Sequence, residues 1–83
     1  MRLLYFAWVK EKTGIAAEEI DVPRDVATIV ELMAWLKTRG PEFAHAFDRS
    51  ESIRAAIDQA HVRHDAKIGG AREIAFFPPV TGG

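Results

Sequence analysis

The sequence contains no cysteine, which excludes a disulfide-stabilised scaffold and a zinc site built from thiolates. Its apolar runs are far shorter than a bilayer requires, so we expect no insertion into a membrane. The 11 basic and 12 acidic side chains nearly cancel, and no basic block is present, so the charge does not indicate binding to nucleic acid. The N-terminus lacks a charged-then-apolar leader, and we expect a cytoplasmic protein.

The motifs of independent enzymes are also missing. The sequence has no Ser-His-Asp order, no phosphate loop and no Gly-rich dinucleotide fingerprint. His61, His64 and Asp65 suggest a metal site, but in a strand the i, i+3 spacing places the two His on opposite faces, and a solvated edge is the better interpretation. We therefore expect no metal, no bound cofactor and no catalytic side chains in this chain.

What is present is typical of one small globular domain: 83 residues, 48% of them hydrophobic and 28% charged. Residues 2–9 are apolar on both alternating faces, which predicts a central strand, and residues 10–14 read as a polar loop. Residues 17–22 predict an antiparallel edge strand. Further strands are predicted at residues 53–58, 60–62 and 72–77.

One main helix is predicted from about residue 28 to residue 39. Thr28 and Glu31 have the spacing of a capping box, and Gly40-Pro41 is a stop signal. An apolar stripe at i, i+3, i+4 and i+7 would pack on a sheet, and it comprises Ile29, Leu32, Met33 and Leu36. The elements together predict an α+β fold with a mixed sheet of four to five strands and this helix on one face.

A single helix leaves the other face of the sheet to be explained. Either Leu4, Phe6, Trp8 and one of Phe76 or Phe77 form an exposed apolar patch, which would mark a partner site, or residues 41–52 fold over that face. Residues 42–52 read as irregular, with one helical turn. Within that turn, Phe43 and Phe47 could pin the segment to the core.

The chain ends in Phe-Phe-Pro-Pro-Val-Thr-Gly-Gly. This is an apolar strand end, followed by a stiff Pro pair and by a tip of small residues. Gly82 and Gly83 lack Cβ atoms, so their backbone fits a narrow slot. Residues 80–83 would reach roughly 13–14 Å. A frayed terminus is the alternative interpretation, although a frayed end needs no stiff spacer.

These residues carry a resemblance to a known family. The opening Leu-Tyr-Phe-Ala-Trp-Val-Lys-Glu and the ending Glu-Ile-Ala-Phe-Phe-Pro-Pro-Val-Thr-Gly-Gly are similar to the small, sulfur-carrier subunit of molybdopterin synthase, and the strand pattern resembles the β-grasp (ubiquitin-like) fold. The resemblance implies a domain at residues 1–77 and an extended tail at residues 78–83. The sequence departs from the family pattern at residues 69–72 and at Asp58, where Asn is more usual.

The resemblance also implies a function in molybdenum cofactor biosynthesis. An activating enzyme would use ATP to adenylate the carboxylate of Gly83, which is then converted to a thiocarboxylate. The large synthase subunit, in a heterotetramer with two copies of each subunit, would take up the tail and use its sulfur to build the dithiolene of molybdopterin. The tail residues are Val80, Thr81 and Gly82, and the candidate docking residues are Phe6, Trp8, Phe76, Phe77 and Pro78.

Three other functions stay open on the sequence. The chain could be a ubiquitin-like modifier joined through Gly83 to lysines, or an interaction module whose Gly-Gly is incidental. Thiamine-type sulfur carriers share the Gly-Gly ending, but they are shorter and lack the Phe-Phe-Pro-Pro segment.

Overall fold

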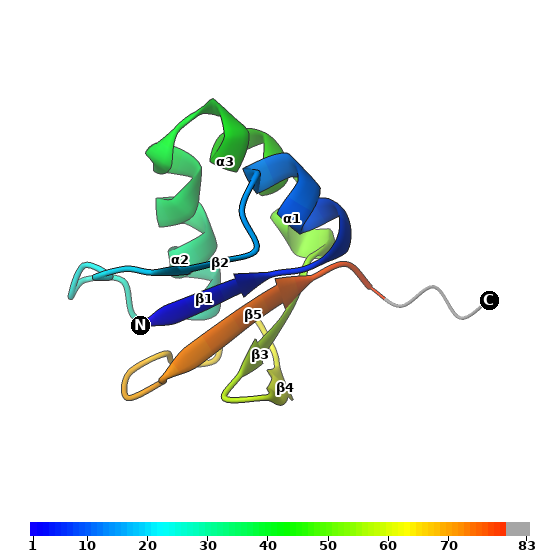
Figure 1. Cartoon of the computed structure of the whole chain (residues 1–83). Helices are drawn as coiled ribbons and strands as arrows, with labels where there is room; N and C mark the ends of the chain where they lie inside the picture. The colour runs from blue at the N-terminus through cyan, green and yellow to red at the C-terminus, as the bar shows by residue number, and fades with distance from the viewer. Residues whose placement is uncertain (80–83) are drawn as a thin grey trace.

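The structure, a computed structural model, describes residues 1–79 and places them in a five-stranded sheet with the strand order β2-β1-β5-β3-β4 (Figure 1). The strands are β1 (Arg2–Tyr5), β2 (Ala17–Glu19), β3 (Arg54–Ile57), β4 (Ala60–Val62) and β5 (Glu73–Phe77). The helices are α1 (Ala7–Thr13), α2 (Ile29–Leu36) and α3 (Pro41–Ala46), with 3-10 turns η1 (Lys37–Arg39) and η2 (Ser50–Ser52). The predicted α+β class with a mixed sheet is confirmed.

Strand β5 lies at the centre of the sheet. It pairs in parallel with β1, where Tyr5 is opposite Phe76, and antiparallel with β3, where Arg54 is opposite Phe77. Because β1 and β5 run in the same direction, both end at the edge of the sheet that lies away from Met1 (Figure 1). The predicted edge strand β2 pairs antiparallel with β1, as expected, but it ends at Glu19.

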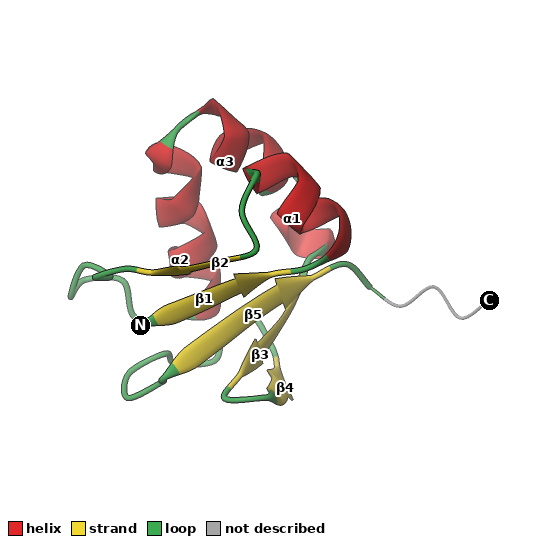
Figure 2. Cartoon of the chain, in the orientation of Figure 1, coloured by secondary structure: helices red, strands yellow, loops and turns green. Residues whose placement is uncertain are grey.

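The two faces of the sheet differ in burial. Figure 2 shows the helices gathered on one side of the sheet, and the side chains that point toward them are fully buried. These are Leu3, Tyr5, Ile74 and Phe76 on the two central strands. The side chains that alternate with them are half-buried, and they are Leu4, Ala75 and Phe77.

Helix α2 forms where the sequence predicts it. The Thr28 hydroxyl accepts a hydrogen bond from the N–H of Glu31 at 3.3 Å, and the Glu31 carboxylate accepts one from the N–H of Thr28 at 3.1 Å, which completes the capping box. The predicted apolar stripe is fully buried. The helix ends at Leu36, continues as η1 to Arg39 and stops at Gly40.

Strand β1 ends at Tyr5 and a helix starts at Ala7, so the prediction of a strand over residues 2–9 is wrong beyond Tyr5. Ala7 has a φ of 53°, and this bend starts α1. The helix then occupies most of the predicted loop at residues 10–14, and Gly14 ends it with its N–H bonded to the carbonyl of Lys10 at 2.9 Å. Val9 and Thr13 are its buried positions, at the i, i+4 spacing of a helix face.

Residues 41–52 are more regular than predicted, because α3 and η2 form there. Pro41 stands at the start of α3, a position that tolerates its missing N–H. Phe43 and Phe47 pin the segment to the core as expected: their ring centroids lie 6.0 and 6.3 Å from that of Tyr5. Residues 1–79 therefore contain three α-helices, where the sequence predicts one main helix. No helix of the described residues is long and apolar enough to cross a membrane.

A polar network ties β1, β2 and η1 together. The Tyr5 hydroxyl donates to Glu18 at 2.7 Å, and Arg39 donates to both oxygens of Glu18 at 2.6 and 2.9 Å. Burial raises the pKa of Tyr5 above its usual range, and the hydrogen bond to Glu18 acts in the same direction. Burial alone would also raise the pKa of Glu18, but the hydrogen bonds from Arg39 and Tyr5 outweigh it and lower that pKa.

We expect Glu18→Gln to lower the free energy of unfolding at neutral pH by about 1–3 kcal/mol, because it removes charge-assisted hydrogen bonds. Since the pKa of Glu18 is lowered by folding, its contribution is present above the unfolded-state pKa and is lost as the pH falls through the folded-state value. Urea unfolding at neutral and acidic pH measures this difference, which should shrink in acid.

The neighbouring Glu19→Gln is the matched control for that experiment. The Glu19 side chain is 72% exposed and lies 3.8 Å from the N-terminal amine, so its loss should cost less than ~1 kcal/mol. An equal loss of stability in both variants would show that the hydrogen bonds of Glu18 stabilise the fold no more than the exposed carboxylate of Glu19 does.

The turn between β3 and β4 consists of Asp58 and Gln59, both in the left-handed region with φ of 47° and 72°. Asp58 also accepts hydrogen bonds from the N–H groups of Arg72 and Glu73 at 3.0 and 2.9 Å. Its carboxylate therefore holds the start of β5. The departure from the family's Asn is accommodated, because both side chains offer an oxygen acceptor and tolerate this backbone.

We expect Gln59→Gly to raise the free energy of unfolding by about 0.5–1 kcal/mol, because glycine enters the left-handed region without steric cost. Urea unfolding measures the gain. Gln59→Ala is the control and should bring none, since alanine keeps the Cβ atom. A lower midpoint for the glycine variant would contradict the prediction.

Candidate functional site

The candidate site begins where the chain leaves the sheet at the end of β5. Phe77 pairs with Arg54 of β3, and the N–H of Phe6 donates to the carbonyl of Phe76 at 3.0 Å. The base of the tail is thus held by backbone hydrogen bonds on both sides. Pro78 and Pro79 follow, half-buried. The predicted tail residues Val80, Thr81, Gly82 and Gly83 lie outside the described residues.

Phe76 belongs to the core, which corrects its place among the candidate docking residues. Its exposed fraction is 0%, and its ring centroid lies 6.2 Å from Tyr5 and 5.2 Å from Phe47. The reason is strand alternation, which turns Phe76 toward the helices and Phe77 to the opposite face. A partner requires accessible surface, so Phe77 and not Phe76 is available to it.

An apolar patch does remain on the open face of the sheet. Phe6 has extended torsions, so the alternation of β1 continues through it and places its ring on the face of Leu4. The ring is 48% exposed. We call the set Leu4, Phe6, Ala75 and Phe77 the open-face patch. Of the two alternatives left by the sequence, covering of this face by α3 is not observed, because α3 packs against α1 and η1 in the helical layer. Phe6 is exposed on the open face, and the other three members of the patch are half-buried.

Trp8 lies apart from this patch. Because α1 begins after Phe6, Trp8 points into the helical layer, where Lys12 Nζ lies 4.8 Å from the centroid of its ring. It lines a hollow of about 450 Å³ next to α3 and η2, which His45, Asp48, Arg49 and Ser52 also line. The predicted docking residues are thus divided: Phe6 and Phe77 share the open face, Trp8 lies among the helices and Phe76 is buried.

The open-face patch is bordered by polar side chains near the start of the tail. Arg54, directly opposite Phe77, is exposed, and the ring centroid of His61 lies 5.1 Å from that of Phe77. In residues 1–79, Arg54 forms no ion pair with a carboxylate. An apolar centre with a basic rim suits a partner surface that is apolar and acidic.

His61 and His64 have different surroundings. His64 Nε2 lies 2.7 Å from the carbonyl oxygen of Ile53, while the His61 ring is tilted by 51° against that of Phe77. Within residues 1–79, no three His, Asp or Glu side chains are grouped to hold a metal ion. The interpretation of these residues as ligands is therefore not supported by the geometry of the described part.

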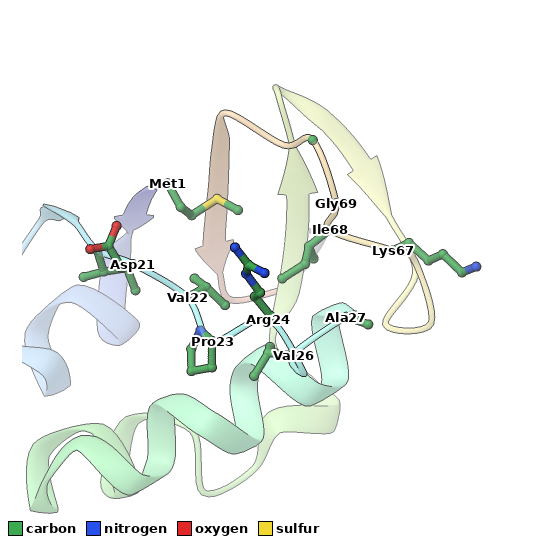
Figure 3. A pocket seen from close by; sticks show the side chains of 12 residues that line it. Met1, Asp21, Val22, Pro23, Arg24, Val26, Ala27, Lys67, Ile68 and Gly69 are labelled. Atoms are coloured by element: carbon green, nitrogen blue, oxygen red, sulfur yellow. The ribbon is translucent and has the colours of Figure 1, made fainter.

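A second hollow, of about 560 Å³, lies at the opposite end of the domain, and the sequence does not predict it (Figure 3). It forms where residues 20–27 and residues 67–70 approach Met1. No local motif marks it, because its walls come from three separate stretches of the sequence, at Met1, residues 20–27 and residues 67–70.

Comparison with known proteins places this geometry in a family. The model of the ThiS family matches residues 3–83. The molybdopterin synthase sulfur carrier subunit of Escherichia coli (strain K12) is 35% identical over 83 residues, covering 100% of this chain and 99% of the relative. The proteins of the same name from Haemophilus influenzae and Homo sapiens are 34% and 33% identical, each over 100% of this chain and over 99% and 93% of their own lengths.

Solved structures agree on the fold. A putative molybdopterin converting factor, subunit 1, from Pyrococcus furiosus superposes with a TM-score of 0.72 at 25% identity, over 95% of each chain. SAMP1 from Haloferax volcanii gives the same TM-score at 23% identity, over 100% of this chain and 98% of its own, and supports the fold alone. The predicted β-grasp fold is confirmed. The chain belongs to the ThiS family, in the group of the molybdopterin synthase sulfur carrier subunits.

Proposed function

We propose that this chain is the sulfur carrier of a molybdopterin synthase and serves molybdenum cofactor synthesis, with the carboxylate of Gly83 as its working group. The observation that supports this most is similarity over the whole chain, at 33–36% identity, to four sulfur carrier subunits. The ending Pro-Pro-Val-Thr-Gly-Gly also supports it, because the last two residues have no Cβ atoms and can enter a narrow active-site slot.

The carboxylate of Gly83 is a poor electrophile until one of its oxygens becomes part of a leaving group. A carboxylate oxygen of Gly83 attacks the α-phosphorus of ATP in an activating enzyme, and pyrophosphate leaves. The resulting acyl-adenylate has a good leaving group. A sulfur nucleophile supplied by a donor then attacks the carbonyl carbon, the bond to the AMP oxygen breaks with its electron pair, and a thiocarboxylate remains.

Sulfur delivery then takes place in the large synthase subunit. The thiocarboxylate sulfur attacks an electrophilic carbon of a pyranopterin precursor, and an oxygen substituent leaves that carbon with its electron pair. Water then attacks the acyl carbon, the bond between carbonyl and sulfur breaks, and the carboxylate is restored while the sulfur stays on the precursor. Acids, bases and cations for these steps would come from the partners. Residues 80–83 span roughly 13–14 Å when extended, which allows the terminus to enter a partner while the domain stays outside.

The open-face patch is the proposed docking surface for the large subunit. Its two aromatic members, Phe6 and Phe77, lie next to the start of the tail. A partner that binds the patch is therefore also positioned to bind the tail. Aromatic side chains at the centre of a contact commonly supply most of its binding energy. We expect a heterotetramer with two copies of each subunit, and a second, exclusive complex with the activating enzyme.

Intact mass spectrometry tests the proposal. The full chain is incubated with an activating enzyme of this pathway, ATP and a sulfide source. A sulfur carrier should gain the mass difference between one sulfur and one oxygen atom, and the gain should vanish without ATP. Adducts through Gly83 to lysines of other proteins would instead favour a protein modifier. An unchanged mass with an enzyme that loads a known carrier would refute the proposal.

A further inference from the structure

A hollow of about 560 Å³ lies at the end of the domain opposite the tail (Figure 3). It opens beside Met1, the residue before β1, and Gly69 and Gly70, which precede β5. The open-face patch lies at the other end of the same strands. A ligand here would therefore leave the proposed working group free.

The walls of the hollow are mostly apolar. Ile68 is 4% exposed and belongs to the core, and Met1, Ile20, Val22 and Val26 are half-buried and pack against that core. All five line the hollow, together with the half-buried Pro23 and the exposed Ala27. Such a surface favours an apolar body in the ligand, and the volume is in the range of small-molecule sites.

One cation, the exposed Arg24, lines this apolar hollow. In Figure 3 the guanidinium of Arg24 extends between Met1 and Ile68, whereas the Lys67 side chain points away from the hollow and the Asp21 carboxylate points outward. In residues 1–79, Arg24 has no carboxylate oxygen within ion-pair distance. Another positive group at the rim, the N-terminal amine, lies 3.8 Å from Glu19.

We propose that this hollow binds a small carboxylate with an apolar chain, whose carboxylate pairs with Arg24 and whose chain covers Met1, Val22 and Ile68. The guanidinium offers two parallel N–H donors, the geometry that a carboxylate accepts. The apolar walls select against small hydrophilic anions, which gain nothing from them. This site is independent of the sulfur-carrier function.

The test is a titration of the full, isotopically labelled chain with hexanoate, followed by two-dimensional amide NMR. Hexanoate should shift the amide signals of residues 20–22, 24–27 and 67–70 and leave those of β3 and β4 in place. We expect a dissociation constant on the order of millimolar, as for a ligand with few heavy atoms. Hexanol and acetate supply the two halves of the ligand separately, and each should bind at least about tenfold more weakly.

Two charge-neutralising variants separate the proposal from a general effect of charge. Arg24→Gln should weaken hexanoate binding about tenfold and leave hexanol binding unchanged. Lys67→Gln removes the same charge from the same rim, but its side chain points away, so binding should change less than about twofold. The amide spectrum of each variant without ligand verifies its fold.

Three results would overturn the inference: equal weakening in both variants, equal binding of hexanol and hexanoate, or shifts spread over the whole surface. A chain without Gly82 and Gly83 should bind hexanoate as the full chain does. The carrier function and this site can therefore fail separately.

Discussion

Deletion of Gly83 should lower dithiolene synthesis by at least about 100-fold while the domain stays folded. The shortened chain still ends in a glycine carboxylate, but that group would stand ~3.5 Å back from the proposed position. A misplacement of even about 1 Å can cost 100-fold in rate. The measurement is molybdopterin formation by the reconstituted synthase with carrier, large subunit, activating enzyme, ATP and a sulfur source.

Two glycine substitutions complete that experiment. Gly82→Val should act like the deletion, because a branched side chain does not fit a slot that accepts glycine. Gly69→Ala is the matched control: a Cβ atom built there meets nothing within 4 Å, so activity and stability should be retained. Normal synthesis by the shortened chain would refute the carrier function of Gly83, and loss of activity in the control would indicate a fold defect instead.

The elements that the sequence predicts well are those with local signals. Helix α2 combines the Thr28–Glu31 capping box with an apolar stripe, so each local preference agrees with the final packing. The strands of the sheet follow from alternation and from the turn residues between them. The family also follows from the sequence, because the ending Phe-Phe-Pro-Pro-Val-Thr-Gly-Gly is a continuous motif.

The features that the sequence did not predict depend on single backbone torsions or on distant residues. The continuous apolar run at positions 6–9 fits a strand as well as a short helix, and the left-handed torsion of Ala7 starts the helix. That one bend separates Trp8 from Phe6. The network of Tyr5, Glu18 and Arg39 joins residues 13 and 21 positions apart, which no local pattern specifies.

Phe6→Asp should weaken binding of the large synthase subunit about 30-fold or more, the effect of losing ~2 kcal/mol at the centre of a contact. The ring of Phe6 is 48% exposed in the free chain, so the change removes little packing within the domain. Phe6 is also the N-cap of α1 and makes no side-chain capping bond, and Asp is a favourable N-cap. The variant should therefore unfold at the same denaturant concentration as the parent, or at a higher one.

Val30→Asp is the control that makes this result specific to the open-face patch. Val30 has the same exposed fraction, 48%, but lies on α2 in the helical layer, where the acidic side chain in the first turn is well tolerated. Titration calorimetry of both variants with the large subunit should show weak binding for Phe6→Asp alone. Because both substitutions add one negative charge, a similar loss in both would point to charge rather than to the patch. Binding unchanged in both would place the docking surface elsewhere.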